Sequence, residues 1–321
     1  MAVYTHLGAE DLADLIAHYD VGTLVSAKGI AEGVSNSNWL IETDRGRFIL
    51  TMYERRIDLG DLPFFLGLLD HLSAAGCPVP RTIHDREGRA SRTLDGKAVA
   101  LIEFLPGVSV DRPTAAQARA VGGALAQVHI AAREFPFERV DPLDPGFNAR
   151  TLEQCGAQAL ASIDPALPAT IETARAVATS WPDDLQRSII HADLFPDNVL
   201  MLGDRVSGMI DFYFACSGAM AYDLAVTHAA WSFDARGSSY RSDVGDALID
   251  GYEAVRPLDH RERQAMPLLA QGACLRFTAS RAEDWLDTPA DALVTRKDPM
   301  DFARRWRFYA EAGETPFAPR G

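Results

Sequence analysis

The pattern of hydrophobic and polar residues divides the chain into a strand-rich first third and a helix-rich remainder. Short apolar or alternating runs, separated by turn-forming residues, predict strands in the first hundred residues. We expect these strands over residues 23–29, 33–42, 47–53, 91–94 and 98–105, with one helix over 61–75. The Asp95-Gly96 pair is a strong signal for a tight turn and predicts a hairpin between the last two strands.

The periodicity changes to helical spacing after Pro106-Gly107. We expect helices over residues 114–132, 152–160, 166–180, 221–231, 243–255 and 261–285. This order of elements predicts an α+β protein with a β-rich N-terminal lobe (residues 1–105) and a mainly helical C-terminal lobe (residues 106–321). A small ligand is expected in a cleft between the lobes, because such clefts are common binding places.

Composition and charge narrow the classes of function. The chain has 321 residues, of which 47% are hydrophobic and 24% charged, as in ordinary globular proteins. A formal net charge of −14 argues against a nucleic-acid partner and against docking on anionic membranes. The start of the chain lacks the pattern of a secretory signal, and no window approaches a membrane span. The four cysteines form no Cys-x-x-Cys pair, which argues against zinc and thioredoxin-like chemistry and fits a reducing cytoplasm.

The segment 188–214 carries the most informative cluster of polar residues. It contains His191, Asp193 and Asn198, then two apolar strands joined by Gly203-Asp204, and then Asp211. If residues 198–202 pair with 206–210, Asn198 lies beside Asp211 at the open end of a hairpin, about 5 Å apart. A carboxylate and an amide oxygen at that separation suit one magnesium ion.

Asp193 reaches the same place across a short loop, where a carboxylate can accept a proton from an attacking hydroxyl. Any one of these aspartates alone is typical of a polar turn, and Asp193 or Asp197 is readily explained in that way. The whole combination instead favours phosphoryl transfer.

The order His-x-Asp-x-x-x-x-Asn, followed by an aspartate after the next hairpin, resembles the aminoglycoside-phosphotransferase-like kinases. These enzymes share the bilobal protein-kinase-like fold and use ATP and Mg²⁺. The resemblance implies that Asp193 is the catalytic base and that Asn198 and Asp211 hold the metal. His191 is then a supporting residue that orients the catalytic loop.

Other segments extend this resemblance over nearly the whole chain. Residues 29–39 resemble the nucleotide loop of the family, in which small residues let backbone amides approach phosphates. Residues 102–107 resemble the linker whose backbone meets adenine. The nucleotide-binding residues implied are Gly33, Val34, Ser35, Asn36, Glu103 and Leu105. Residues 122–129 resemble a core helix, and Asp223 resembles a structural aspartate at a helix start.

Four strings resemble the homoserine kinases of this superfamily in particular, namely residues 33–38, 48–54, 62–64 and 275–281. The implied reaction is transfer of the γ-phosphate of ATP to the side-chain hydroxyl of L-homoserine, on the route to threonine. The chain departs from the wider superfamily at Thr51, where a phosphate-binding lysine is usual, and the helix over 61–75 lacks a glutamate to pair with it. Magnesium and loop amides, or the cations Lys28 or Arg55, are candidates to replace that lysine.

Homoserine is a zwitterion, so its recognition needs a donor for the carboxylate and an acceptor for the ammonium. We expect Arg276 at the carboxylate, with Arg281 as the second choice, and Asp197 at the ammonium. Asn38 is expected to line the substrate site. A solvated or salt-bridged helix arginine is the plain alternative for Arg276, and a hydrogen bond at the hairpin mouth for Asp197. Residues 304–307, which contain three arginines, are expected to form a solvated helix face.

Two other functions stay open at this point. One is a kinase of another small hydroxyl compound, such as an aminoglycoside or an amino alcohol. An arginine facing the substrate argues against a polycationic acceptor. The other is a non-catalytic nucleotide-binding pseudokinase. The missing strand lysine is its only support, and the joint presence of Asp193, Asn198 and Asp211 argues against it.

Overall fold

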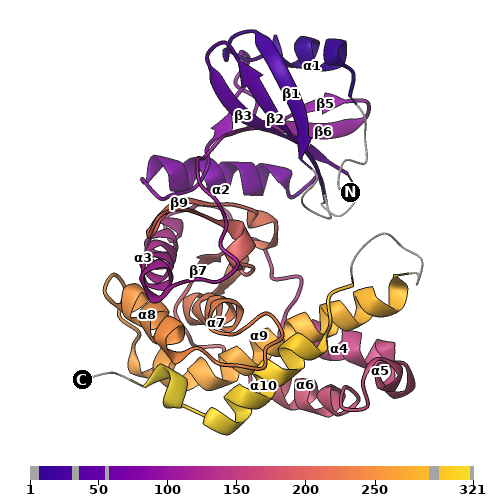
Figure 1. The fold of residues 1–321 in the computed structure, drawn as a ribbon, viewed down its shortest axis with the longest axis vertical. Coiled ribbons are helices and arrows are strands. Elements are labelled where there is room, and N and C mark those ends of the chain that lie inside the picture. The colour runs from indigo at the N-terminus through magenta and orange to yellow at the C-terminus, as the bar shows by residue number, and fades with distance from the viewer. Residues whose placement is uncertain (1–6, 31–35, 55–57, 289–295, 319–321) are drawn as a thin grey trace. The chain divides into compact units, whose positions relative to one another are not determined.

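The computed structural model describes residues 7–30, 36–54, 58–288 and 296–318. The chain forms two compact units, residues 1–107 and residues 108–321 (Figure 1). The division lies two residues beyond the boundary expected at 105/106. Each unit has its own buried core.

The first unit is built on a six-stranded antiparallel sheet. The strands are β1 (Leu24–Ile30), β2 (Asn36–Thr43), β3 (Gly46–Tyr53), β4 (Thr82–Ile83), β5 (Arg92–Leu94) and β6 (Lys97–Glu103). They follow the order β1-β2-β3-β6-β4, and β5 pairs with β6. The predicted hairpin is confirmed: Asp95 and Gly96 both have positive φ angles (50° and 76°), as a two-residue turn of this kind requires.

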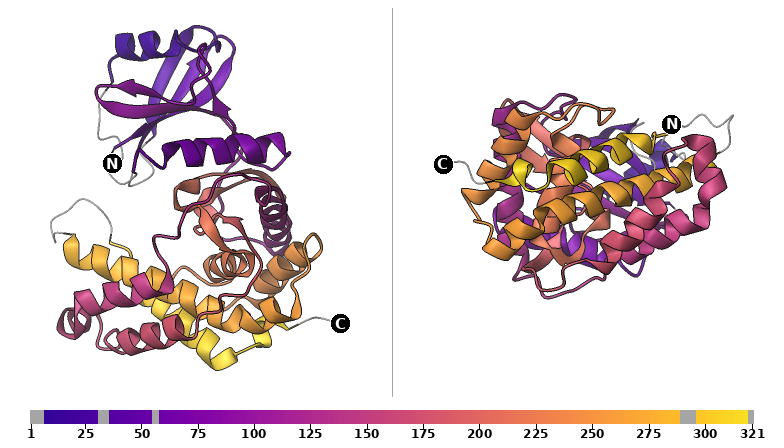
Figure 2. Two further views of the ribbon diagram at one scale, coloured as in Figure 1. Left: turned by 180° about the vertical axis from the view of Figure 1, so that it is seen from behind. Right: turned by 90° about the horizontal axis from the view of Figure 1, so that it is seen from below.

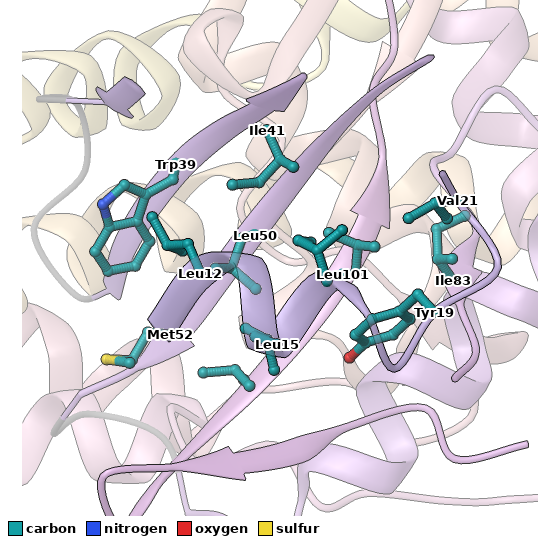
Figure 3. Packing of buried hydrophobic residues seen from close by; sticks show 12 residues of the cluster. Leu12, Leu15, Tyr19, Val21, Trp39, Ile41, Leu50, Met52, Ile83 and Leu101 are labelled. Carbon is teal, nitrogen blue, oxygen red and sulfur yellow. The ribbon is translucent and has the colours of Figure 1, made fainter. Parts of the chain in front are cut away.

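Helix α1 (Ala9–Ile16), which the sequence analysis did not anticipate, covers one face of this sheet. Its Leu12 and Leu15 pack on Trp39, Leu50 and other alternate residues of the strands (Figure 3). Helix α2 (Leu62–Ala74) matches the expected helix, with Pro63 in its first turn, where a missing N–H costs nothing. It is joined to β4, since the backbone N–H of Thr82 donates to Asp70 at 2.9 Å.

The strand alternation places the polar residues of interest on the other face of the sheet. Asn38 and Thr51 are direct cross-strand partners, and the Thr51 hydroxyl donates to Asn38 Oδ1 at 2.8 Å. Lys28 is the partner of Leu40 in the register of β1 and β2, so its side chain lies on the same face as Asn38. Lys28 is exposed, whereas Thr51 is buried.

The second unit is mainly helical. Its helices are α3 (Ala115–Ala132), α4 (Pro145–Cys155), α5 (Ala157–Ile163), α6 (Ala169–Thr179), α7 (Met220–Trp231), α8 (Ser242–Glu253), α9 (His260–Asp287) and α10 (Met300–Ala312). Two short antiparallel pairs accompany them: β7 (Arg187–Ile190) with β10 (Cys216–Ala219), and β8 (Val199–Leu202) with β9 (Arg205–Met209). Helix α7 is buried along its whole length, while α9 and α10 run side by side (Figure 2). Within the described ranges, no helix combines the length and the apolar character needed to cross a membrane.

Two expectations about the helices were wrong. Residues 152–160 do not form one helix, because Gly156 has a left-handed φ of 79° and separates α4 from α5. Residues 304–307 do not form a solvated face, because Arg305 is buried against the rest of the unit. Its guanidinium donates to the backbone oxygens of Ala229 and Asp234, at 3.0 and 3.1 Å.

Candidate active site

The hairpin of β8 and β9 brings Asn198 and Asp211 to the same end. Val199 pairs with Met209, and the N–H of Ile210 donates to the carbonyl of Asn198 at 3.0 Å. The predicted register at the open end is therefore confirmed, although a β-bulge follows between Leu200 and Met201. Asn198 closes a short 3-10 turn (η1, Pro196–Asn198) rather than starting the strand, and Asp211 takes a left-handed conformation with φ of 66°.

The loop before this hairpin is held by a buried carboxylate of α7. Ala192 has a left-handed φ of 62°, which is costly for a residue with a Cβ. Asp223 compensates by accepting the N–H of His191 and the N–H of Ala192, both at 2.7 Å. The role of Asp223 as a structural aspartate is thus confirmed. Burial opposes its ionisation, but these donors and His129 outweigh it and hold the pKa of Asp223 below its usual value.

Further contacts hold the same loop from α7 and α9. Arg276 donates to the carbonyl of Ala192, and Trp231 donates its indole N–H to the carbonyl of Leu194 at 2.9 Å. The ring of Phe195 packs edge-on against Phe277, with centroids 4.8 Å apart. The residues on both sides of Asp193 are therefore fixed by separate partners, which restricts the position of its carboxylate.

His191 links the two ends of the site. Its Nδ1 accepts the N–H of Asp193 at 3.2 Å, and its Nε2 lies 3.0 Å from the carbonyl of Ile210. These partners require a neutral ring with the proton on Nε2, and burial lowers the pKa of His191 in agreement with this. The imidazole thus connects the backbone of Asp193 to the backbone of Ile210, the residue just before Asp211.

Asn198 turns its amide toward Asp193. Its nitrogen donates to the backbone oxygen of Asp193 at 2.8 Å and lies 3.4 Å from one carboxylate oxygen. This orientation leaves Oδ1 of Asn198 as the atom available to a cation. Burial, with the charges of Asp211 and Asp197 adding to it, raises the pKa of Asp193 to about 7. Partial desolvation by the surrounding protein, with the charge of Asp197 adding to it, raises the pKa of Asp211 to about 6. Solvent still reaches this side chain.

The donor set suits a hard cation that brings other ligands with it. Among the described residues, no three His, Cys, Asp or Glu side chains come together as a complete metal site. Magnesium commonly takes only one or two protein oxygens and completes its shell with phosphates and water. Asn198 Oδ1 and the Asp211 carboxylate match that requirement, and the raised pKa values of Asp193 and Asp211 indicate a place where positive charge is favourable.

Comparisons with known proteins agree with this arrangement. A sequence model of the phosphotransferase enzyme family matches residues 26–258, which is more than half of the chain. The chain belongs to this family.

Relatives within the phosphotransferase family match along nearly the full length. A homoserine kinase of Methylobacterium radiotolerans is 49% identical, covering 97% of each chain. A homoserine kinase of Azorhizobium caulinodans is 48% identical, covering 96% of each chain. Among solved structures, an amicoumacin kinase has a TM-score of 0.70 at 14% identity (97% of this chain and 96% of that chain), and a spectinomycin phosphotransferase a TM-score of 0.67 at 14% identity (98% and 96%). These structures support the fold of the phosphotransferase.

A network of hydrogen-bonded, buried polar side chains extends from Asp223. The imidazole Nε2 of His129 contacts Asp223 at 2.9 Å, and its Nδ1 contacts the hydroxyl of Tyr252 at 2.8 Å. Tyr252 accepts from Arg256 at 3.3 Å, which in turn pairs with Glu262 at 2.6 Å. Asp223 and the core position of His129 are predictable from the sequence. Tyr252, Arg256 and Glu262 are not, since nothing in their spacing indicates a shared network.

The two arginines expected at the substrate are engaged elsewhere. Arg276 is only 3% exposed, lies over the rings of Phe214 and Phe277, and bonds the catalytic loop. Arg281 donates to the carbonyl of Asp298 at 3.2 Å and to the carboxylate of Asp301 at 3.1 Å. Both guanidinium groups therefore already have protein partners, and their contact with a substrate stays a prediction.

The other residues predicted to bind nucleotide or substrate lie in both units. Asp197 is exposed and lines a hollow of about 240 Å³ with Pro196, Ser109, Val110 and Asp111. In the first unit, Asn38 bonds Thr51, Asn36 is buried at the start of β2, Glu103 ends β6, and Leu105 is half-buried. Gly33, Val34, Ser35 and Arg55 lie outside the described residues.

We expect Asp223→Asn to lower the free energy of unfolding by about 3–5 kcal/mol, because the amide presents N–H groups to donors that need an acceptor in a buried place. Asp250→Asn is the matched control. Asp250 pairs with Arg119 at 2.7 Å, but both side chains are roughly half exposed, so the same change costs at most about 1 kcal/mol. Urea unfolding followed by circular dichroism measures both. Equal losses in the two variants would contradict the role given to Asp223.

Proposed function

We propose that this phosphotransferase is a homoserine kinase, which transfers the γ-phosphoryl group of ATP to the side-chain hydroxyl of L-homoserine on the route to threonine. The observation that carries the proposal is the placement of Asp193 beside Asn198, next to a hairpin that ends in Asp211. The homoserine kinases that match at 46–49% identity over 96–98% of this chain support the choice of acceptor.

In this reaction Asp193 is the catalytic base. Its carboxylate is partly shielded from solvent, and its pKa of about 7 suits a group that takes a proton near neutral pH. The acceptor hydroxyl loses its proton to Asp193 as its oxygen bonds the γ-phosphorus, and the bond from that phosphorus to the β,γ-bridging oxygen breaks to release ADP. His191 acts as a positioning residue, because it bonds the backbone of Asp193 and of Ile210.

Asn198 and Asp211 are the residues that would hold Mg²⁺. The ion would neutralise negative charge on the phosphates, which is its usual contribution to phosphoryl transfer. Asn198 is suited to this by the orientation of its amide, whose nitrogen is bonded to Asp193. Asp211 is suited by its place at the open end of the hairpin, where solvent reaches its carboxylate.

The first unit is proposed to bind the nucleotide. The residues assigned to it are Gly33, Val34, Ser35, Asn36, Glu103 and Leu105. Thr51 is a poor substitute for the usual phosphate-binding lysine, because its hydroxyl is bonded to Asn38. Lys28 is better placed, since it is exposed and lies on the same face of the sheet as Asn38 and Thr51.

Asp197 is proposed to receive the ammonium group of the acceptor. It lies four residues after Asp193 and lines an open hollow together with Asp111. Two carboxylates around one hollow attract a cationic group. This acidic hollow also suits amino alcohols and aminoglycosides, so the acceptor must be established by experiment.

The proposal predicts ADP release that depends on both Mg²⁺ and L-homoserine. A coupled assay compares L-homoserine with L-serine, choline and an aminoglycoside at equal concentration. We expect L-homoserine to give the highest kcat/KM by at least about tenfold, because only it combines the hydroxyl, the ammonium and the carboxylate at the right separation. Preferred turnover of another acceptor would redirect the assignment, and ATP binding without turnover of any acceptor would indicate a pseudokinase.

Replacing the proposed base gives a second prediction. Asp193→Asn should lower kcat by about 10²–10⁴-fold, since the amide cannot accept the proton, while ATP affinity stays within about twofold. Asp204→Asn is the control, because Asp204 is exposed in the turn of the same hairpin. Steady-state kinetics and fluorescence titration with a nucleotide analogue measure the two quantities. Full activity of Asp193→Asn would remove Asp193 from the chemistry.

A further inference from the structure

The first unit contains a hollow of about 380 Å³ that the proposed reaction does not use. Its wall is formed by the residues after α1, by the β2–β3 turn with the start of β3, and by β4 with the residues on either side of it. Pockets that hold small organic molecules in proteins begin at about 300 Å³. The hollow is therefore large enough for a small ligand, and the chemistry of its lining indicates which kind.

The floor of the hollow is apolar. Val21 and Ile83 belong to the buried core beneath α1 and lie together at one end of it (Figure 3). Phe48 packs against the same core but is only half-buried, so part of its ring is open to a ligand. Because side chains alternate along a strand, Phe48 and Leu50 of β3 share the α1 face of the sheet, whereas Thr51 lies on the other face. The hollow is therefore separate from the polar face that carries Thr51.

Two basic groups at the rim are shared with acidic residues. The Arg45 guanidinium donates to Asp20 at 2.9 Å, but the two side chains are 63% and 81% exposed, so Arg45 can turn toward a ligand at little cost. Both ring nitrogens of His84 face acceptors, namely Asp70 at 2.6 Å and the carbonyl of Gly88 at 3.1 Å. The protonated ring satisfies both acceptors, and the bond to Asp70 raises the pKa of His84 accordingly.

Arg81 supplies a positive charge without a counterpart. Its side chain is exposed at the hollow, and in the ranges that the structure describes no acidic side chain pairs with its guanidinium. Its backbone is held by Glu103 of β6, whose carboxylate accepts the N–H of Arg81 at 3.3 Å and whose N–H donates to the carbonyl of Arg81 at 3.0 Å. A guanidinium can bind a carboxylate through two parallel hydrogen bonds. The rim is therefore complementary to a carboxylate in charge and in hydrogen-bonding geometry.

We propose that this hollow binds a small organic anion, whose carboxylate lies between Arg81 and Arg45 and whose apolar body rests on Phe48. The lining has more basic than acidic groups, so it disfavours cationic compounds. An inorganic anion would leave the apolar floor uncovered, and a neutral apolar molecule would leave Arg81 without a partner. The inference does not depend on which alcohol is phosphorylated, because no group of the acceptor enters it.

Isothermal titration calorimetry of the full chain with three probes tests the proposal. 2-Naphthoate has both a carboxylate and a flat apolar body, acetate has only the carboxylate, and 2-naphthylmethanol has only the apolar body. We expect 2-naphthoate to bind with a dissociation constant below about 1 mM, and each of the other probes to bind at least about fivefold more weakly. Absence of binding by 2-naphthoate, or equally tight binding of 2-naphthylmethanol, would overturn the proposal.

A change in the protein tests the role of the rim. Arg81→Gln removes the unpaired charge from an exposed side chain, and it should weaken 2-naphthoate binding by about 5–20-fold. Arg307→Gln, at an exposed position of α10 in the second unit, is the matched control and should leave the affinity unchanged. An equal loss in the two variants would show that the probe responds to the net charge of the chain and not to this hollow.

A nucleotide arm tests where the probe binds. A saturating non-hydrolysable ATP analogue with Mg²⁺ should leave the affinity for 2-naphthoate within about twofold, because the hollow is separate from the polar face that carries Thr51. Displacement of 2-naphthoate by the nucleotide would place the probe in the nucleotide site and overturn the inference. Both results leave the kinase assignment unchanged, since that assignment is decided by turnover of L-homoserine.

Discussion

The carboxylate of Asp223 is fully buried, and a charge in such a place is tolerated only if nearly all of its acceptor capacity is used. The catalytic loop supplies two of its donors through the N–H groups of His191 and Ala192, and His129 supplies the third. The same bonds hold Ala192 in a left-handed conformation that its Cβ disfavours. One buried carboxylate therefore contributes both to the stability of the core and to the shape of the loop.

A rigid loop suits the role proposed for Asp193, because the carboxylate of a general base must be held within reach of the hydroxyl that it deprotonates. The backbone of residues 191–195 is bonded by Asp223, Arg276, Trp231 and His191, and Phe195 is packed against aromatic rings. The position of the Asp193 carboxylate is then set by protein groups and not by solvent. Preorganised groups of this kind avoid reorganisation at the moment of reaction, which is where phosphotransferases gain much of their rate.

Much of this arrangement is predictable from local sequence. Pairing residues 198–202 with 206–210 places Asn198 near Asp211 before any coordinates are known. At the open end this register is correct, although the turn pairs Leu202 with Arg205 and the bulge after Leu200, which the sequence does not predict, restores it. The burial of Arg276 is not predictable in this way. A helical pattern shows which residues share a face of the helix, but not which face the tertiary packing buries. Arg276 and Arg305 are both buried beside apolar neighbours, and their guanidinium groups donate to backbone oxygens in the interior. Helix α1 and the break at Gly156 were missed for a related reason, since short amphipathic segments and single glycines are ambiguous without their packing partners.

If Asp193 is the base, Asp223 acts on catalysis through it, and kcat in a double-mutant cycle tests this most directly. In the otherwise unaltered chain, Asp223→Asn should lower kcat by at least about tenfold under conditions where circular dichroism shows it to be folded. In the Asp193→Asn background the same change should cost almost nothing further, because the group being positioned is already absent. Losses that multiply in the double variant would show that Asp223 contributes independently of Asp193 and would contradict the account.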